Sequence, residues 1–360
     1  DRVGTMVQPV SQKYAVLYQV SYDLLDARIA KTYRQIGLLL LVGIVLGIFL
    51  AIIIGQKATR PIKSLTAGAA EIAEGHFDHR VHIHSQDELG LLSNAFNRMA
   101  ADLKKSTKAL VYKERVAKEL EIAKTIQESL IPKEIPEIEG LDIAASVNPA
   151  AEIGGDCYDF IKLDEDKTLM YLGDVTGHGV PAGLLVSVAN AIIYAYSHLK
   201  EIMQIMVKTN AILQAKSQAN MFITLAMLSW NGKTKKMDYV SAGHEKILHY
   251  NSKKKAITEL ESGGIALGMV PDCSKLLKKH PIDLNKGDTI IIYSDGIPEA
   301  WGKKKEQYGM GRLRRILMDT AAHADLPAEK IREKIITDLE AFMGSTEQAD
   351  DITLMVVKKV

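Results

Sequence analysis

Four acidic side chains stand where hydrophobic stretches of the sequence run into glycine-containing turns. Asp174 and Asp295 each follow a strongly apolar stretch, Asp350 precedes another, and Asp156 ends the motif Gly154-Gly155-Asp156. Short apolar runs bounded by turn residues predict buried β-strands. Because the ends of adjacent strands converge, we expect these carboxylates to form one cluster.

Such a cluster needs a positive partner, since two like charges about 4 Å apart repel by roughly 4 kcal/mol at an effective dielectric constant near 20. Oxygen ligands without a Cys or His cluster favour Mg²⁺ or Mn²⁺ over Zn²⁺. The glycines beside Asp156, Asp174 and Asp295 are expected to allow close approach and positive φ, so that a main-chain carbonyl such as that of Val175 could also face the ion. The alternative is that each is an ordinary turn aspartate.

Ordered sequence blocks surround the four aspartates. They are Asn148-Pro149-Ala150, 154–160, 173–182, Ser241-Ala242-Gly243-His244, Leu267-Gly268, 293–300 and Asp350-Asp351-Ile352-Thr353. At these blocks, over about residues 140–360, the chain resembles the SpoIIE/RsbU-like branch of the PPM metal-dependent protein serine/threonine phosphatases. The resemblance implies an α+β fold, an α/β/β/α sandwich of two antiparallel sheets flanked by helices.

The resemblance also implies a role for each carboxylate. Asp174 would bridge two metal ions, with Asp295 and Asp350 completing one site and Asp156 plus the Val175 carbonyl the other. Asp351 is the weaker candidate of its pair. The implied reaction is hydrolysis of phosphoserine or phosphothreonine by a metal-activated water, on a phosphorylated STAS-type anti-sigma-factor antagonist. Two cations can activate a shared water and neutralise phosphoryl oxygens, so no covalent intermediate is needed.

Two other functions fit the same residues. The domain could be a catalytically silent binding module, although the retention of all four carboxylates argues against this. It could also hydrolyse small phosphate esters, because metal ions recognise phosphate rather than the protein around it. A net charge of +1 argues against a nucleic-acid partner. Cys157 and Cys273 form no CxxC-type pair, so neither a disulfide framework nor a zinc site is expected.

Four further residues near the motifs have expected roles outside the set of predicted metal ligands. His178, between two glycines, could contact phosphate or act as a general acid, or it could stabilise the turn. His244 is expected to be structural. Thr176 and Thr353 are expected to hydrogen-bond turns or water near the metal.

The N-terminal third contains a candidate membrane span at 36–54, a stretch with no charged side chain. Nineteen helical residues reach about 28 Å, close to the hydrocarbon thickness of a bilayer. A signal peptide and a buried core helix are the alternatives. We expect 1–35 to be the end of an extracytoplasmic segment of a larger receptor in the cell inner membrane, crossing it once here, with everything after the span cytoplasmic.

Two amphipathic helices follow the span. Pro61 is expected to open the first and Gly75 to end it, and Asp87-Glu88-Leu89-Gly90 to open the second. Placed directly after a span, they resemble a HAMP domain at 55–107, which implies a homodimer; a plain amphipathic hairpin is the alternative.

The apolar seam continues beyond the second helix. It predicts a coiled-coil helix at 108–136, ended by Pro132 and Pro136, before a phosphatase domain at 137–360. Histidines also cluster between the two HAMP-like helices, where a metal or pH sensor is one interpretation and solvated loop residues are the favoured one. They are His76, His79, His82 and His84.

Overall fold

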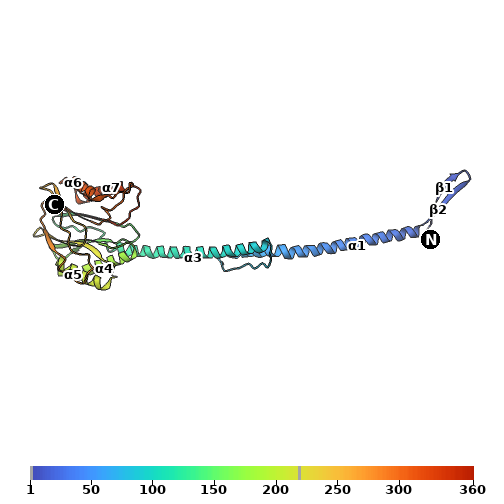
Figure 1. The fold of residues 1–360 in the computed structure, drawn as a ribbon, viewed down its shortest axis with the longest axis horizontal. Coiled ribbons are helices and arrows are strands. Elements are labelled where there is room, and N and C mark those ends of the chain that lie inside the picture. Colours follow the sequence, from blue (N-terminus) through green and yellow to red (C-terminus); the bar gives the residue numbers. More distant parts are fainter. Residues whose placement is uncertain (1–2, 218–219) are drawn as a thin grey trace. The chain divides into compact units, whose positions relative to one another are not determined.

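A computed structural model describes residues 3–217 and 220–360 (Figure 1). The chain divides into two compact units, Asp1–Glu114 and Arg115–Val360. The boundary falls inside one long helix, α3 (Glu88–Glu128).

The first unit begins with an antiparallel hairpin of β1 (Val3–Ser11) and β2 (Tyr14–Ser21), followed by α1 (Tyr22–Ile54). The predicted span lies within α1, and the apolar window found there is long enough to cross a membrane and has none of its side chains buried. A second helix, Val180–Leu199, passes the same test but is partly buried in the C-terminal unit. Core helices of soluble proteins also satisfy this test of length and composition.

Pro61 lies in the first turn of α2, as predicted, but the helix before it does not end. A π-helical turn (Gly55–Thr59) joins α1 to α2 (Arg60–Ala73), so the helix continues through this point. Proline lacks an N–H, and its ring clashes with the carbonyl four residues earlier in a regular helix. The wider π turn just before Pro61 accommodates it without a break.

Gly75 follows the end of α2 with φ of +91°, as predicted for a helix terminator. The connector then packs against α3 through Val81, whose N–H donates to Asn97 Oδ1 (3.0 Å) and whose carbonyl accepts from Ser93 Oγ (2.7 Å). Gly68 of α2 makes room, because a Cβ there would collide with Val81 Cγ2. The four connector histidines are exposed, and no metal-ligand cluster forms among the described residues.

The start of α3 is as predicted, since Asp87 Oδ1 accepts the N–H of Leu89 at 3.0 Å. Its end differs: the helix stops at Glu128, before Pro132, in a short turn. Seam residues Leu92, Met99 and Leu103 are exposed in the single chain.

The second unit contains two five-stranded antiparallel sheets. The first has the order β10 (Lys279–Ile282), β7 (Lys236–Ala242), β6 (Ile223–Asn231), β5 (Lys167–Val175) and β4 (Asp156–Lys162). The second has the order β3 (Leu141–Asn148), β12 (Ile352–Lys359), β11 (Thr289–Tyr293), β8 (Leu248–Asn251) and β9 (Ala256–Glu259).

Helices cover the outer face of each sheet (Figure 1). The first sheet packs against α4 (Val180–Tyr196) and α5 (Ile202–Lys216), which are joined by a 3₁₀ turn (Ser197–Leu199). The second packs against α6 (Gly309–Ala321) and α7 (Ala328–Met343). A third apolar cluster lies between the sheets. This α/β/β/α sandwich confirms the predicted fold class.

Strand periodicity decides which layer each side chain enters. In β5, Leu169, Tyr171 and Val175 pack toward the helices, whereas Met170 and Leu172 pack between the sheets. Successive side chains of a strand point to opposite faces. Asp174 therefore shares the inter-sheet face with Met170 and Leu172.

Candidate metal centre

Asp156 and Asp174 are directly opposite each other on β4 and β5. Opposed residues of an antiparallel pair project from the same face, so both carboxylates lie at the end of the inter-sheet layer. Thr224 of β6 is in turn opposite Asp174, which extends the row across three strands.

The second sheet contributes Ser294 and Thr353 to the same layer. Thr353 Oγ1 donates a 2.5 Å hydrogen bond to Asp156 Oδ2, and the Thr353 N–H donates to Ser294 Oγ at 2.9 Å. Asp156 is only 2% exposed. A carboxylate on one sheet is thus held by a hydroxyl of the other. Thr353 was predicted to hydrogen-bond a turn or water near the metal, but its hydroxyl bonds directly to Asp156.

Asp351 supports the loop that precedes Asp156. Its carboxylate accepts the N–H groups of Ala150 (2.7 Å), Gly155 (2.5 Å) and Asp156 (3.2 Å). Asp350, by contrast, is exposed and accepts the N–H of Asp351 at 2.8 Å. Asp350 is therefore the side chain that is free to turn toward an ion. This agrees with the prediction that Asp350, rather than Asp351, is the metal ligand.

Glycines permit close approach at this site, as predicted. A Cβ on Gly155 would lie 2.9 Å from the carbonyl oxygens of both Val175 and Gly177, and one on Gly296 would overlap the Asp351 carbonyl. The expectation of positive φ beside the aspartates is wrong. Positive φ occurs instead at Gly177 (+85°) and Gly179 (+80°), where the chain turns from β5 into α4.

The carboxylates are strongly coupled electrostatically. Burial, together with the charges of Asp295 and Asp350, raises the pKa of Asp174 to about 8. Burial and the charge of Asp350 raise the pKa of Asp295 to about 6. The pKa of Asp156 is raised well above its usual value by burial and by Asp174, against the opposing hydrogen bonds of Thr353 and Ser294. The four predicted residues therefore share one electrostatic environment.

These features fit a hard divalent cation. The donors are carboxylate oxygens with backbone carbonyls close by, and a cation would relieve their repulsion. Among residues 3–217 and 220–360, however, no group of three or more His, Cys, Asp or Glu side chains already stands at coordination geometry. The ligand set of Asp156, Asp174, Val175, Asp295 and Asp350 stays a prediction, and forming it requires the carboxylates to turn toward one another.

The two histidines near the motifs differ sharply in environment. His178 is exposed on the turn before α4, whereas His244 is buried with Nδ1 2.8 Å from Thr224 Oγ1. Thr176 Oγ1 accepts the N–H of Phe222 at 3.2 Å, which is the turn-stabilising contact predicted for it.

Gln127 is a supporting residue that the sequence did not reveal. Near the end of α3, its Nε2 donates to the Gly154 carbonyl (2.6 Å) and its Oε1 accepts the Gly154 N–H (3.1 Å). Ser294 was also missed, although it stands beside Asp295 in a quoted block. The position of Ser294 directly before Asp295 is a signal that could have identified it. No sequence pattern connects Gln127 to Gly154, which lies much later in the chain.

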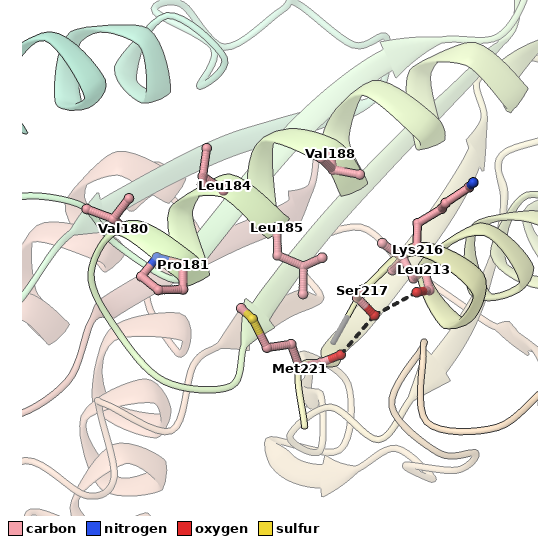
Figure 2. A pocket seen from close by; sticks show the side chains of 9 residues that line it. All are labelled: Val180, Pro181, Leu184, Leu185, Val188, Leu213, Lys216, Ser217 and Met221. Carbon is pink, nitrogen blue, oxygen red and sulfur yellow. Dashed lines mark hydrogen bonds between the residues drawn. The ribbon is translucent and has the colours of Figure 1, made fainter. Parts of the chain in front are cut away.

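An apolar groove of about 390 Å³ begins next to the metal loop (Figure 2). Val180, Leu184 and Val188 of α4 form one side, and Leu213 and Met221 lie opposite. The groove contains no carboxylate, so it is separate from the candidate metal centre.

Comparisons with known proteins agree with this geometry. A HAMP-domain model matches residues 53–105, which confirms the resemblance noted above. Phosphoserine phosphatase RsbU of Bacillus subtilis is 34% identical over 191 residues, 52% of this chain and 55% of that protein. Protein IcfG of Synechocystis is 28% identical over 334 residues, 84% of this chain and 51% of that protein. The chain thus spans about half the length of these curated relatives.

The solved structure of the SiaA-PP2C domain of Pseudomonas aeruginosa matches with a TM-score of 0.59 and 22% identity, covering 69% of this chain and 98% of that one. This likeness supports the PP2C fold. The model of Stage II sporulation protein E (SpoIIE) matches residues 164–360, more than half of the chain and three of the four predicted acidic ligands. The protein belongs to the SpoIIE family.

Proposed function

We propose that the C-terminal domain, 137–360, is a metal-dependent protein serine/threonine phosphatase. The observation that carries this proposal is the carboxylate pair of buried Asp156 and half-buried Asp174, which stand opposite each other on adjacent strands of one sheet and are coupled to Asp295 and Asp350. Like charges are buried together mainly where an ion or a reaction needs them. Membership of the SpoIIE family agrees with this reading.

The cofactor proposed is a pair of Mn²⁺ or Mg²⁺ ions. Asp174 would bridge them, Asp295 and Asp350 would complete one site, and Asp156 with the Val175 carbonyl the other. Bound divalent ions would activate water and neutralise phosphoryl oxygens. Thr353 holds the Asp156 carboxylate in place, Ser294 accepts the Thr353 N–H, and Asp351 fixes the backbone of the loop before Asp156. These four aspartates are the proposed catalytic residues.

The proposed substrate is a phosphoserine or phosphothreonine of a partner protein, of the STAS type. RsbU and RsbP of Bacillus subtilis, two relatives of the chain, are named phosphoserine phosphatases.

We further propose that the chain is a membrane-anchored homodimer, with the HAMP and phosphatase domains in the cytoplasm. The apolar stretch in α1 precedes the HAMP match directly. Leu92, Met99 and Leu103 leave an apolar stripe of α3 exposed in the single chain, as expected for a seam that a second chain covers.

Control of the enzyme is proposed to pass along α3. This helix starts in the HAMP region and ends where Gln127 binds both the N–H and the carbonyl of Gly154, next to the Asp156 loop. A rotation of the helix would pull on that loop. Two states a few kcal/mol apart are enough to shift populations substantially.

The metal requirement gives the first prediction. The full chain in detergent should hydrolyse a phosphoester only with Mn²⁺ or Mg²⁺, and Asp174→Asn or Asp295→Asn should remove that activity, because each loses a charged ligand. Phosphate release is measured with and without chelator. Glu165→Gln, on an exposed turn, serves as the control. Full turnover in excess chelator would rule out the two-metal mechanism.

The Asp350-Asp351 pair should separate metal binding from stability. Asp351→Asn should lower the free energy of unfolding by about 1–3 kcal/mol, because buried N–H groups lose a charged acceptor. Asp350→Asn should change it by no more than about 0.5 kcal/mol and yet weaken Mn²⁺ binding. Denaturant unfolding and calorimetric Mn²⁺ titration measure the two effects. The opposite pattern would exchange the roles assigned to these residues.

Substrate class is tested by comparing kcat/KM for a phosphorylated STAS-domain protein with that for p-nitrophenyl phosphate. We expect the protein to be the better substrate by orders of magnitude, since remote contacts add to transition-state binding. Equal or higher values for the small ester would favour the alternative, a hydrolase of small phosphate esters.

Insertions near Thr107 test the coupling. One added residue rotates the downstream helix by about 100°, whereas seven approximately restore its phase. Phosphatase activity in membranes should change strongly with the one-residue insertion and return with the seven-residue insertion. The Mn²⁺ affinity of the detergent-solubilised protein should be the same in both variants, because neither insertion touches a metal ligand. Indifference to insertion length would make α3 a passive tether.

A further inference from the structure

His244 lies just after β7 and is 3% exposed. Its Nδ1 is 2.8 Å from Thr224 Oγ1, while its Nε2 has no hydrogen-bond partner among the described residues. Burial lowers the pKa of the ring to about 4. The imidazole is therefore neutral at physiological pH and is held beside β6 of the first sheet.

The hydrogen-bond partner of the ring leads to a predicted metal ligand. Thr224 of β6 is directly opposite Asp174 on β5. His244 is thus bonded to the strand that lies beside the Asp174 ligand.

The surrounding chain fixes the ring in this position. Gly243 has φ of +69°, and a Cβ there would lie 2.8 Å from the Ala266 N atom, so the 263–266 segment passes directly over it. Ser262 Oγ donates to the His244 carbonyl at 2.6 Å. Backbone motion at His244 is restricted on both sides.

Stability alone gives no reason for an imidazole here. A buried polar nitrogen without a partner costs free energy, and an apolar ring of similar volume would avoid that cost. A polar ring is useful where it orients neighbouring groups. Residues that orient metal ligands from outside the coordination sphere typically alter metal affinity by about 10–100-fold when they are changed.

We propose that His244 is a positioning residue, which through its hydrogen bond with Thr224 fixes the start of β6 beside Asp174 and so the position of that ligand. This inference rests on the proposed metal-dependent function. It assigns His244 no contact with substrate or metal.

The test measures Mn²⁺ binding by the full chain in detergent. Calorimetry and the Mn²⁺ electron paramagnetic resonance signal both report this binding. His244→Phe keeps a ring of similar size but loses the Thr224 contact, and should weaken Mn²⁺ affinity about 10-fold or more. The activity it retains should recover at high Mn²⁺ concentration, with kcat changed less than the Mn²⁺ requirement.

His249 supplies a matched control. It is also buried, on β8, with Nε2 3.2 Å from Asp288 Oδ2. His249→Phe should lower the thermal midpoint in chelator at least as much as His244→Phe but leave Mn²⁺ affinity unchanged. Equal loss of affinity in both variants would reduce the effect to general destabilisation and overturn the proposal.

A pair of Thr224 variants decides the question even if His244→Phe does not fold. Thr224→Val removes the hydroxyl and should weaken Mn²⁺ binding in the same direction, whereas Thr224→Ser should bind as the wild type does. Wild-type affinity in Thr224→Val, or equal weakening in Thr224→Ser, overturns the positioning role alone. Failure of the wild-type chain to bind Mn²⁺ would instead overturn the proposed function.

Discussion

The burial of Asp156 between the two sheets is the constraint on which the site depends. Removing a carboxylate from water costs several kcal/mol unless charges or hydrogen bonds compensate. Here the compensation comes from the opposite sheet, through Thr353 and Ser294. The hydrogen bonds that make the carboxylate tolerable are also hydrogen bonds between the sheets, so the sandwich and the site cannot be altered independently.

The loop that carries Asp156 is held mainly through its backbone. Asp351 accepts three N–H groups of two segments, and Gln127 pairs with both polar groups of the Gly154 peptide. Contacts of this kind fix the path of the chain while leaving the ligand side chains free to turn. This arrangement suits a site whose carboxylates interact electrostatically but do not yet stand at metal-coordination distance among the described residues.

The sequence predicted the parts of this structure that follow from local periodicity. A short apolar run placed Asp174 near a strand end, and Asp87 and Gly75 marked helix limits that the structure reproduces. The π turn before Pro61 was missed because a proline is compatible with either a helix start or a widened turn. Gln127 was missed because its partner lies on a loop that only the folded chain brings near. Positive φ was misplaced because glycine beside an aspartate serves equally for close approach, which is what Gly155 and Gly296 provide.

The three N–H groups that share the Asp351 carboxylate have a consequence for solvent exchange. Ala150 lies near the start of the loop between β3 and β4, whereas Gly155 ends that loop and Asp156 begins β4, yet a single side chain is their common acceptor. Local opening exposes amides in cooperative units. Hydrogen–deuterium exchange at these three positions is thus linked, and together they form a built-in reporter of whether the loop beside the β4 strand is closed or open.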